Sequence, residues 1–214
     1  MTEKILIIDT ETTNTIEDAL VYDVGYIVAD YDGNIYHRDS FVNADVFCDK
    51  ELMSSAYFVE KIPQYWKEIK RGERTLTSFR KIMWTLRHVM KDYDIKKVYA
   101  YNCRFDYCSL STTQRYLTKS KWRYFFPYTT SFYDILAYSR EILKTDKNYR
   151  QFCIDNGYVT SRNVNRYTAE IVARYFFDND FVEEHTALAD SEIEYKILMK
   201  CIELDKTNYN CKMW

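Results

Sequence analysis

Runs and alternation of apolar residues predict a set of strands at the start of the chain. Residues 4–9, KILIID, form an isoleucine-rich run that is typical of a buried strand and ends in an aspartate. Residues 21–31 and 34–42 have strand character and flank Asp32-Gly33, a dipeptide that favours an antiparallel hairpin. We therefore expect these three strands to pair in sequence order.

Helical spacing dominates the remainder of the chain. Residues 49–94 change to long polar and apolar side chains at helical spacing and are predicted to be a helical region. Residues 97–101, KVYAY, return to strand character. Later helices are expected at 104–117, 133–144, 148–156, 167–177 and 187–203, with Asn156-Gly157 as a stop signal for the third of them. This order predicts an α/β fold with a central mixed sheet, three antiparallel N-terminal strands and helices on its faces.

Composition narrows the class of protein. The chain has 214 residues, which fits one domain spanning residues 1–214. Apolar residues make up 47% and there are only four glycines and two prolines, so a packed core is expected and disorder is not. The 30 basic and 32 acidic residues nearly cancel, which argues against a protein held to phosphates by its overall charge. Any contact with nucleic acid must therefore be local.

Cysteine spacing and hydropathy indicate a cytoplasmic protein. The six cysteines lack Cys-x-x-Cys spacing, so we expect reduced thiols and not a zinc or redox site. No segment approaches the roughly 20 apolar residues that a membrane span needs, and we expect no membrane partner. The N-terminal apolar run meets acidic residues and does not have the pattern of a cleaved signal peptide.

The first candidate for chemistry is the pair Asp9 and Glu11, which follows the first predicted strand as Asp-x-Glu. This spacing lets both side chains project to the same side of an extended backbone. The pattern alone is weak, because about one such pair is expected by chance, and two solvated carboxylates at a strand end would look the same.

The second candidate is Asp106, which ends the segment NCRFD where a strand enters a helix. An acidic residue there can simply stabilise the helix N-terminus. However, Asp106 shares a helix face with Leu110 and Leu117, and a buried carboxylate requires a positive partner or a metal ion.

The third candidate is HTALAD, residues 185–190. On a continuous helix His185 and Asp190 would lie about 140° apart, so they converge only if His185 precedes the helix. Asp190 would then lie on the apolar stripe of Ile193, Ile197 and Cys201. With only three histidines in the chain, this His-x-Ala-x-x-Asp pattern has chance odds on the order of one in a hundred. The competing interpretation is a satisfied histidine near a helix end.

Four carboxylates that meet at strand and helix ends require cations between them. At about 5 Å and an effective dielectric of about 20, each like-charge pair costs roughly 3 kcal/mol. Oxygen ligands of this kind suit Mg²⁺ or Mn²⁺ and not zinc, and a pair of such ions can stabilise in-line phosphoryl displacement.

Taken together, IIDTETT, NCRFD and HTALAD followed by SEIEYKIL resemble the three motifs of the DEDDh 3′–5′ exonucleases of the ribonuclease H-like fold. This family includes the proofreading subunit of bacterial replicative polymerases. The motifs occur in family order and span nearly the whole chain, and residues 132–143 resemble the family segment between the second and third motifs.

The resemblance implies specific roles. Asp9, Glu11, Asp106 and Asp190 would hold two divalent ions, and His185 would be the general base that activates the attacking water. The reaction would release nucleoside 5′-monophosphates from the 3′ end of a nucleic acid, with single-stranded DNA favoured and RNA as the alternative. The family's tyrosine variant is not supported, because position 185 is histidine.

The resemblance also implies substrate contacts. Thr12 and Thr13 would lie at the terminal base, Phe105 would stack on a base or belong to the core, and Asn102 would support the site. The family usually has glycine where this chain has Asn14, and asparagine tolerates the left-handed backbone that such a turn needs.

Several residues outside the three motifs are further candidates for a structural or a substrate-binding role. Asp134 is expected to have a local role at the start of its helix. Residues 115–126 interleave basic and aromatic side chains, which fits either contact with a single strand or a solvated loop beside core aromatics. Arg162 and Arg166 are weaker candidates of the same kind.

Two alternative functions remain open. The first is a binding module for nucleic acid or for a polymerase or other replication or repair partner, in which the chemistry is incidental. The second is a phosphodiesterase of short oligonucleotides. The sequence does not decide the oligomeric state, the pathway or the choice between DNA and RNA.

Overall fold

The computed structural model describes residues 2–14, 18–118 and 123–213, and within them the strands form one six-stranded sheet. The strand order is β4-β3-β2-β1-β5-β6. β1, β2 and β3 pair antiparallel in sequence order, as predicted, whereas β4, β5 and β6 pair in parallel with their neighbours. The strands are β1 (Lys4–Thr13), β2 (Leu20–Asp30), β3 (Ile35–Asn43), β4 (Thr75–Thr77), β5 (Lys97–Ala100) and β6 (Ser131–Asp134).

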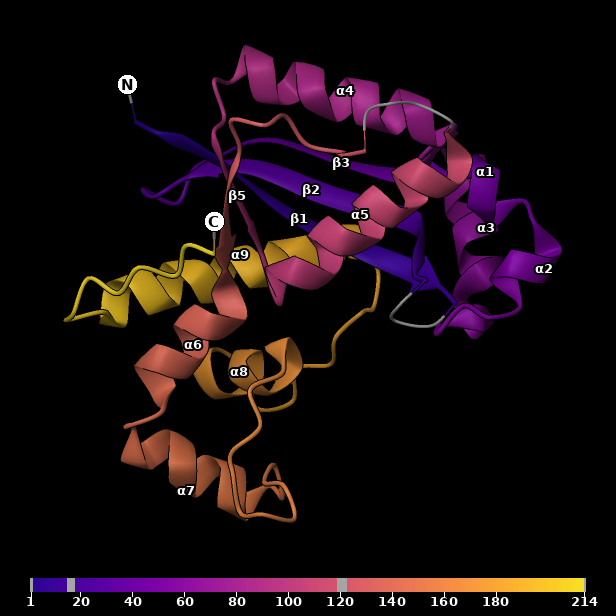
Figure 1. The fold of residues 1–214 in the computed structure, drawn as a ribbon. Helices are drawn as coiled ribbons and strands as arrows, with labels where there is room; N and C mark the ends of the chain where they lie inside the picture. The colour runs from indigo at the N-terminus through magenta and orange to yellow at the C-terminus, as the bar shows by residue number, and fades with distance from the viewer. Residues whose placement is uncertain (1, 15–17, 119–122, 214) are drawn as a thin grey trace.

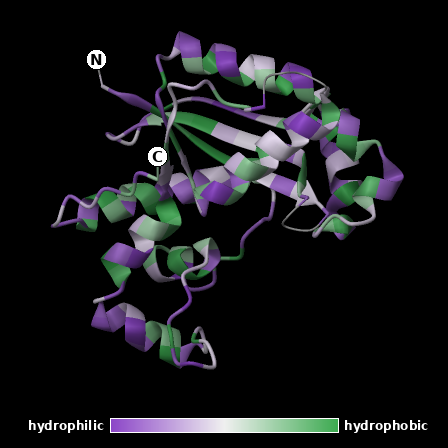
Figure 2. Ribbon diagram, in the orientation of Figure 1, coloured by the Kyte–Doolittle hydropathy of each residue, from purple (hydrophilic) through white to green (hydrophobic). Residues whose placement is uncertain are grey.

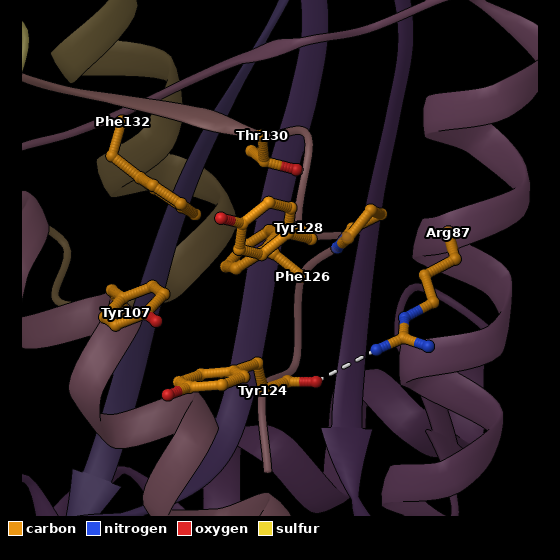
Figure 3. A pocket seen from close by; sticks show the side chains of 8 residues that line it. Arg87, Tyr107, Tyr124, Phe126, Tyr128, Thr130 and Phe132 are labelled. Carbon is orange, nitrogen blue, oxygen red and sulfur yellow. Dashed lines mark hydrogen bonds between the residues drawn. The ribbon is translucent and has the colours of Figure 1, made fainter. Parts of the chain in front are cut away.

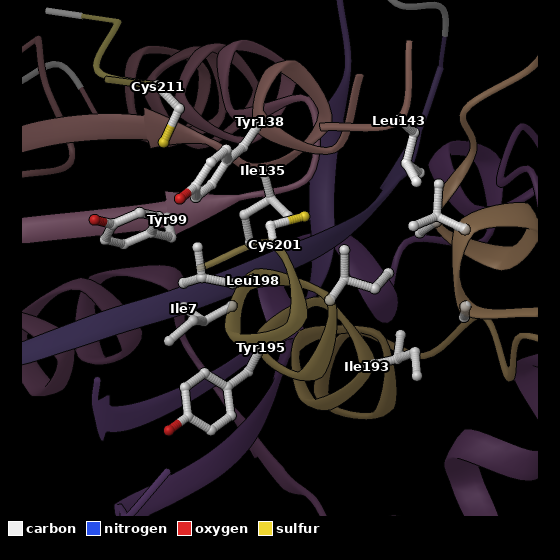
Figure 4. Packing of buried hydrophobic residues seen from close by; sticks show 14 of the residues in the cluster. Ile7, Tyr99, Ile135, Tyr138, Leu143, Ile193, Tyr195, Leu198, Cys201 and Cys211 are labelled. Carbon is white, nitrogen blue, oxygen red and sulfur yellow. The ribbon is translucent and has the colours of Figure 1, made fainter. Parts of the chain in front are cut away.

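Helices cover both faces of this sheet (Figure 1). One face packs against α4 and α5, through even-numbered β1 residues such as Leu6 and Ile8. The other face packs against α6 and α9 through Ile5 and Ile7, and this cluster is drawn in Figure 4. The helices are α1 (Ala44–Phe47), α2 (Lys50–Met53), η1 (Val59–Lys61), α3 (Ile62–Arg71), α4 (Phe79–Asp92), α5 (Cys103–Leu117), α6 (Ile135–Leu143), α7 (Lys147–Asp155), α8 (Ala169–Phe176) and α9 (Ala187–Leu204).

The polar pattern of the chain explains where these elements begin and end. The β2–β3 turn contains Gly33 at φ +92°, a left-handed conformation that glycine adopts without steric cost. Asp134 accepts hydrogen bonds from Leu136 N and Ala137 N and so caps α6, which confirms its expected local role. The predicted stop of α7 at Asn156-Gly157 is also confirmed. Figure 2 shows the central strands as largely apolar, whereas the helices mix apolar and polar residues.

Two short strands were not predicted. The 49–94 region is not helical throughout, because Thr75–Thr77 pairs with β3 between α3 and α4. The helix predicted at 133–144 begins only at Ile135, because Ser131–Asp134 pairs with β5. Both segments are too short to show an alternating pattern, and pairing with a neighbouring strand determines their conformation. The predicted α/β class is otherwise confirmed.

The contact between β2 and the start of α9 depends on Gly25. A Cβ atom placed there would lie 2.0 Å from Leu188 N and 2.1 Å from the carbonyl carbon of Ala187. Gly25 also pairs directly with Asp9 in the β1–β2 register. The missing side chain therefore lets the first turn of α9 lie against the sheet next to Asp9.

The cysteines and the hydropathy of the helices are two further features of the described part of the chain. All six cysteines are free thiols, as predicted. Among the described helices, none combines the length and apolar character needed to cross a membrane.

We predict that Gly25→Ala destabilises the protein by about 3 kcal/mol, because the added methyl group must displace helix backbone and not a flexible side chain. Urea unfolding measures this change. Gly33→Ala is the matched control: nothing lies within 4 Å of its added Cβ, so only backbone strain of about 1 kcal/mol is expected. Equal losses for the two variants would contradict the proposed role of Gly25.

Candidate active site

The alternation of β1 places Asp9 and Glu11 on the face that packs against α9. Ile5 and Ile7 belong to the core cluster on that face, and Asp9 and Glu11 continue the same odd-numbered series. Glu11 is buried, at 9% exposure, and Asp9 is partly buried. The strand thus delivers two carboxylates to the region beneath the start of α9.

α9 brings further carboxylates to the same place. Asp190 and Glu194 lie one helical turn apart, and both are buried, at 6% and 3% exposure. The start of the helix is fixed by Asp23 on β2, which accepts a hydrogen bond from Ala187 N at 3.1 Å. Ser191 Oγ donates to the carbonyl oxygen of Gly25 at 3.0 Å. These contacts hold α9 in the register that directs Asp190 and Glu194 toward β1.

The side chains that could bind a metal ion form two groups that share Asp190. Oxygen atoms of Asp9, Glu11 and Asp190 all lie within 4.8 Å of one another. A second group with the same spacing consists of Glu183, His185 and Asp190. Asp190 therefore connects the histidine to the carboxylates of β1.

Asp106 approaches from the other face of β1. It is 2% exposed on α5, and Thr10 Oγ1 donates to its Oδ1 at 2.8 Å. Thr10 lies on the even-numbered face of β1, between Asp9 and Glu11. Among the described residues, Asp106 belongs to neither 4.8 Å group. Burial, the charge of Glu194 and then the charge of Asp106 raise the pKa of Asp9.

His185 precedes α9, as its spacing from Asp190 required. Its φ of +50° turns the chain into the helix, a conformation in which histidine is enriched among non-glycine residues. The imidazole stacks on the ring of Phe58 at 4.2 Å between centroids, and its Nδ1 lies 3.7 Å from Glu183 Oε2. Burial and nearby Lys61 lower the pKa of His185, which favours the neutral ring near pH 7.

Burial and mutual repulsion raise the pKa of each of these carboxylates above its ordinary value. Burial is the largest cause for Glu11, whose pKa rises to about 9, and Asp190 is the strongest of its charged neighbours. Burial and Glu183 raise the pKa of Asp190 to about 8. The pKa of Asp106 rises to about 7 on burial, although its hydrogen bond from Thr10 lowers it. Without cations, several of these groups would therefore hold protons near neutral pH.

Glu183 and Glu194 are two nearby acids that the sequence interpretation missed. Burial raises the pKa of Glu183 to about 7, and burial with Asp106 and Asp190 raises the pKa of Glu194 well above its ordinary value. Glu194 lies four residues after Asp190, so helical spacing was the signal that pointed to it. Glu183 precedes the helix and gave no such periodic signal.

The predicted substrate contacts occupy different environments. Asn102 is exposed at φ +62° before α5, and Phe105 and Thr12 are partly buried. Thr13 is fully buried, and its hydroxyl donates a long hydrogen bond of 3.5 Å to the carbonyl oxygen of Leu20. Their substrate roles stay predictions. Asn14 adopts φ +65°, the left-handed conformation that asparagine tolerates.

A cavity of about 510 Å³ opens beside the acidic residues. Three of its lining residues are acidic, Asp9, Glu183 and Glu194, and are called its acidic wall, whereas two are basic, Arg140 and Arg166, and are called its basic wall. A volume in this range is typical of ligand sites. The acidic residues therefore border a space that can admit part of a substrate.

A separate aromatic pocket of about 440 Å³ lies beside α4 and α5 (Figure 3). Tyr107, Tyr124 and Tyr128 line it, and Arg87 donates to the carbonyl oxygens of Tyr124 and Phe125. It includes part of the predicted basic and aromatic stretch 115–126, of which residues 119–122 lie outside the described part of the chain. Within the stretch, Tyr116 and Tyr124 are exposed, whereas Phe125 and Phe126 are core residues. The contact with a single strand stays a prediction.

Comparison with known proteins supports the fold. No protein-family model matches the chain, and no curated protein matches it. Solved structures that share its fold include a zinc-bound E. coli exonuclease I–single-stranded DNA complex, with a TM-score of 0.64, 13% identity and coverage of 97% of this chain. A 3′-exonuclease that recognises the histone mRNA stem-loop has a TM-score of 0.60, 10% identity and 94% coverage of this chain. Cell-death related nuclease 4 has a TM-score of 0.55, 9% identity and 94% coverage.

The present chain spans 41% of the exonuclease I chain and 64% of each of the other two. At these identities the match establishes the architecture and not the chemistry. The predicted ribonuclease H-like fold is thereby confirmed.

We predict that the stability of the cation-free protein falls as pH rises. The pKa of Glu11, about 9, and that of Asp190, about 8, exceed their ordinary values of 4.5 and 3.8, so the folded state binds protons more tightly than the unfolded state. This stabilisation is complete below about pH 4 and is lost as pH rises toward about 9. Added Mg²⁺ or Mn²⁺ should raise the melting temperature more at about pH 8.5 than at about pH 5.5.

Glu194→Gln tests whether repulsion between the buried carboxylates causes the predicted loss of stability at high pH. This variant should melt at a higher temperature without cations at high pH and should gain less from added Mg²⁺, because one repelling carboxylate is removed. Glu203→Gln, on the exposed side of the same helix, should behave as the unaltered protein. A pH-independent melting temperature for the unaltered protein would contradict this account.

Proposed function

We propose that this chain is a metal-dependent DEDDh-type 3′–5′ exonuclease whose 214 residues form a single catalytic domain. The main support for this proposal is that carboxylate oxygens of Asp9, Glu11 and Asp190 lie within 4.8 Å of one another. His185 belongs to a second group of the same spacing that also contains Asp190. The shared architecture with exonucleases supports this assignment. The proposed reaction removes nucleoside 5′-monophosphates from the 3′ end, with single-stranded DNA as the favoured substrate and RNA as the alternative.

The donor atoms fit Mg²⁺ or Mn²⁺. All four proposed ligands, Asp9, Glu11, Asp106 and Asp190, offer carboxylate oxygens, which these hard cations prefer. Among the described side chains, Asp190 Oδ1 and Glu194 Oε2 are buried without a hydrogen-bond partner. Buried anionic oxygens of this kind require a positive partner. We assign two ions to the site, in which they would stabilise the negative charge of the phosphoryl group during displacement.

His185 is the proposed general base. Its neutral ring can accept a proton from the attacking water at a free ring nitrogen, and stacking on Phe58 limits rotation of the ring. Which nitrogen accepts depends on the tautomer. Asp190 and Glu183, the other members of its group, would stabilise the imidazolium formed. The water oxygen would then bond to phosphorus as the bond from phosphorus to the 3′ oxygen of the preceding nucleotide breaks. That 3′ oxygen would take up a proton and remain as the new 3′ hydroxyl of the strand, and the phosphate would stay on the 5′ oxygen of the departing nucleotide.

The catalytic assignment is tested with labelled DNA and RNA oligonucleotides, single- and double-stranded, in Mg²⁺ or Mn²⁺, with identification of products. We expect mononucleotides from a single strand with a free 3′ hydroxyl. Intact substrates under every condition, with a folded protein, would falsify the proposal.

Variants separate catalysis from binding. Asp9→Ala should lower kcat by at least about a hundredfold, and His185→Ala by roughly 10²- to 10⁴-fold. Both should still bind a single strand, as measured by fluorescence anisotropy. Full cleavage by Asp9→Ala would instead favour a contaminating nuclease and a binding module. Activity confined to dinucleotides and other very short chains would favour the short-oligonucleotide phosphodiesterase.

A further inference from the structure

The 510 Å³ cavity has walls of opposite charge, and the proposed chemistry uses only one of them. Asp9, Glu183 and Glu194 form the acidic wall. The basic wall comes from α6 and from the segment before α8, and carries Arg140 and Arg166. The position of these arginines in the same cavity as Asp9 calls for a role in addition to that of the carboxylates.

Both arginines are available to a ligand. Their residues are exposed, and among the described residues neither guanidinium forms an ion pair or a side-chain hydrogen bond. The Arg140 guanidinium lies over the Tyr167 ring, 5.7 Å from its centroid. Such stacking orients a guanidinium while leaving its N–H donors free.

The backbone that carries Arg166 is held in place. Tyr149 Oη donates to the carbonyl oxygen of Arg166, and Tyr101 Oη donates to that of Tyr167. The N–H group of Arg166 donates to the carbonyl oxygen of Tyr158 at 2.9 Å. Tyr101 also lines the cavity, so the loop is tied directly to the end of β5. The position of Arg166 is therefore set before any ligand arrives.

We infer that Arg140 and Arg166 bind a non-scissile phosphate of the substrate strand, and this inference rests on the proposed exonuclease function. The scissile phosphate must lie at the acidic wall, where cations offset the charge of Asp9. A second phosphate of the same strand would then meet the basic wall. Guanidinium groups match phosphate oxygens through paired N–H donors, and a carboxylate-lined wall alone would repel that phosphate.

A simpler role is that the two arginines only moderate the negative potential of the acidic wall. The two roles differ in what they predict for substrate length. A contact with a second phosphate acts only on substrates that possess one, whereas a general effect on the potential acts on every substrate alike.

The test compares a single-phosphate substrate, the p-nitrophenyl ester of thymidine 5′-monophosphate, with single-stranded oligonucleotides. For Arg140→Gln and Arg166→Gln we expect kcat/KM on oligonucleotides to fall about tenfold more than on the ester, mainly through KM. Arg71→Gln removes the same charge outside the cavity and serves as the matched control. Equal losses on both substrates, or no loss on either, would overturn the inference.

Binding supplies a readout that does not depend on turnover. In a His185→Ala background, the salt dependence of oligonucleotide affinity should weaken by about 0.7 in log–log slope for each phosphate contact removed. The Arg71→Gln control should retain the original slope. An unchanged slope in the double variant of Arg140 and Arg166 would overturn the inference.

Failure of the inference is distinguishable from failure of the proposed function. If the unaltered protein cleaves neither the ester nor the oligonucleotides, the exonuclease assignment fails. If it cleaves both and the arginine variants lose no selectivity for longer strands, only the inference fails.

Discussion

The crowding of buried negative charge at the end of β1 is the constraint on which the rest of the site depends. Asp9, Glu11 and Asp190 meet within 4.8 Å, and Asp106 and Glu194 add to the same field. Each raised pKa shows that these groups cannot all be ionised at low cost. The arrangement becomes favourable near neutral pH only with protons or cations, so ion binding and folding stability are linked through the same residues.

Most residues that hold the acidic side chains together are not themselves proposed metal ligands. Gly25 lets the backbone of α9 lie against β2, and Asp23 fixes the start of that helix through Ala187 N. Asp23 itself accepts hydrogen bonds from Tyr65 Oη at 2.7 Å and Arg74 Nη1 at 2.9 Å, which offset its burial. Thr10 fixes Asp106 from the opposite face. A helix, a strand and a second helix are thus held together by neutral or already paired groups.

The sequence predicted those features that leave a local pattern. The existence of the first strand, the hairpin at Asp32-Gly33 and the placement of His185 before α9 all follow from periodicity and turn chemistry. The predicted end of that strand at Asp9 is wrong, because β1 continues to Thr13 in its pairing with β2. β4 and β6 were missed because each is short and lies next to a segment of helical spacing, and each forms through pairing with a neighbouring strand. Gly25 and Arg140 were missed for a related reason. Their importance comes from residues that are distant in sequence, namely Leu188 and the acidic wall.

The small net charge of the chain can be related to the acidic and basic residues that line the cavity. A chain with a formal charge of −2 cannot attract a polyanion over long distances, and the carboxylates of the acidic wall would repel it. If the proposed substrate is correct, attraction would arise within the cavity, from cations at the acidic wall and from the guanidinium groups of the basic wall. Because these two sources of positive charge would come from different residues of the cavity lining, they would distinguish one phosphate of a strand from the next. Charge placement, and not net charge, would then determine which bond reaches the carboxylates.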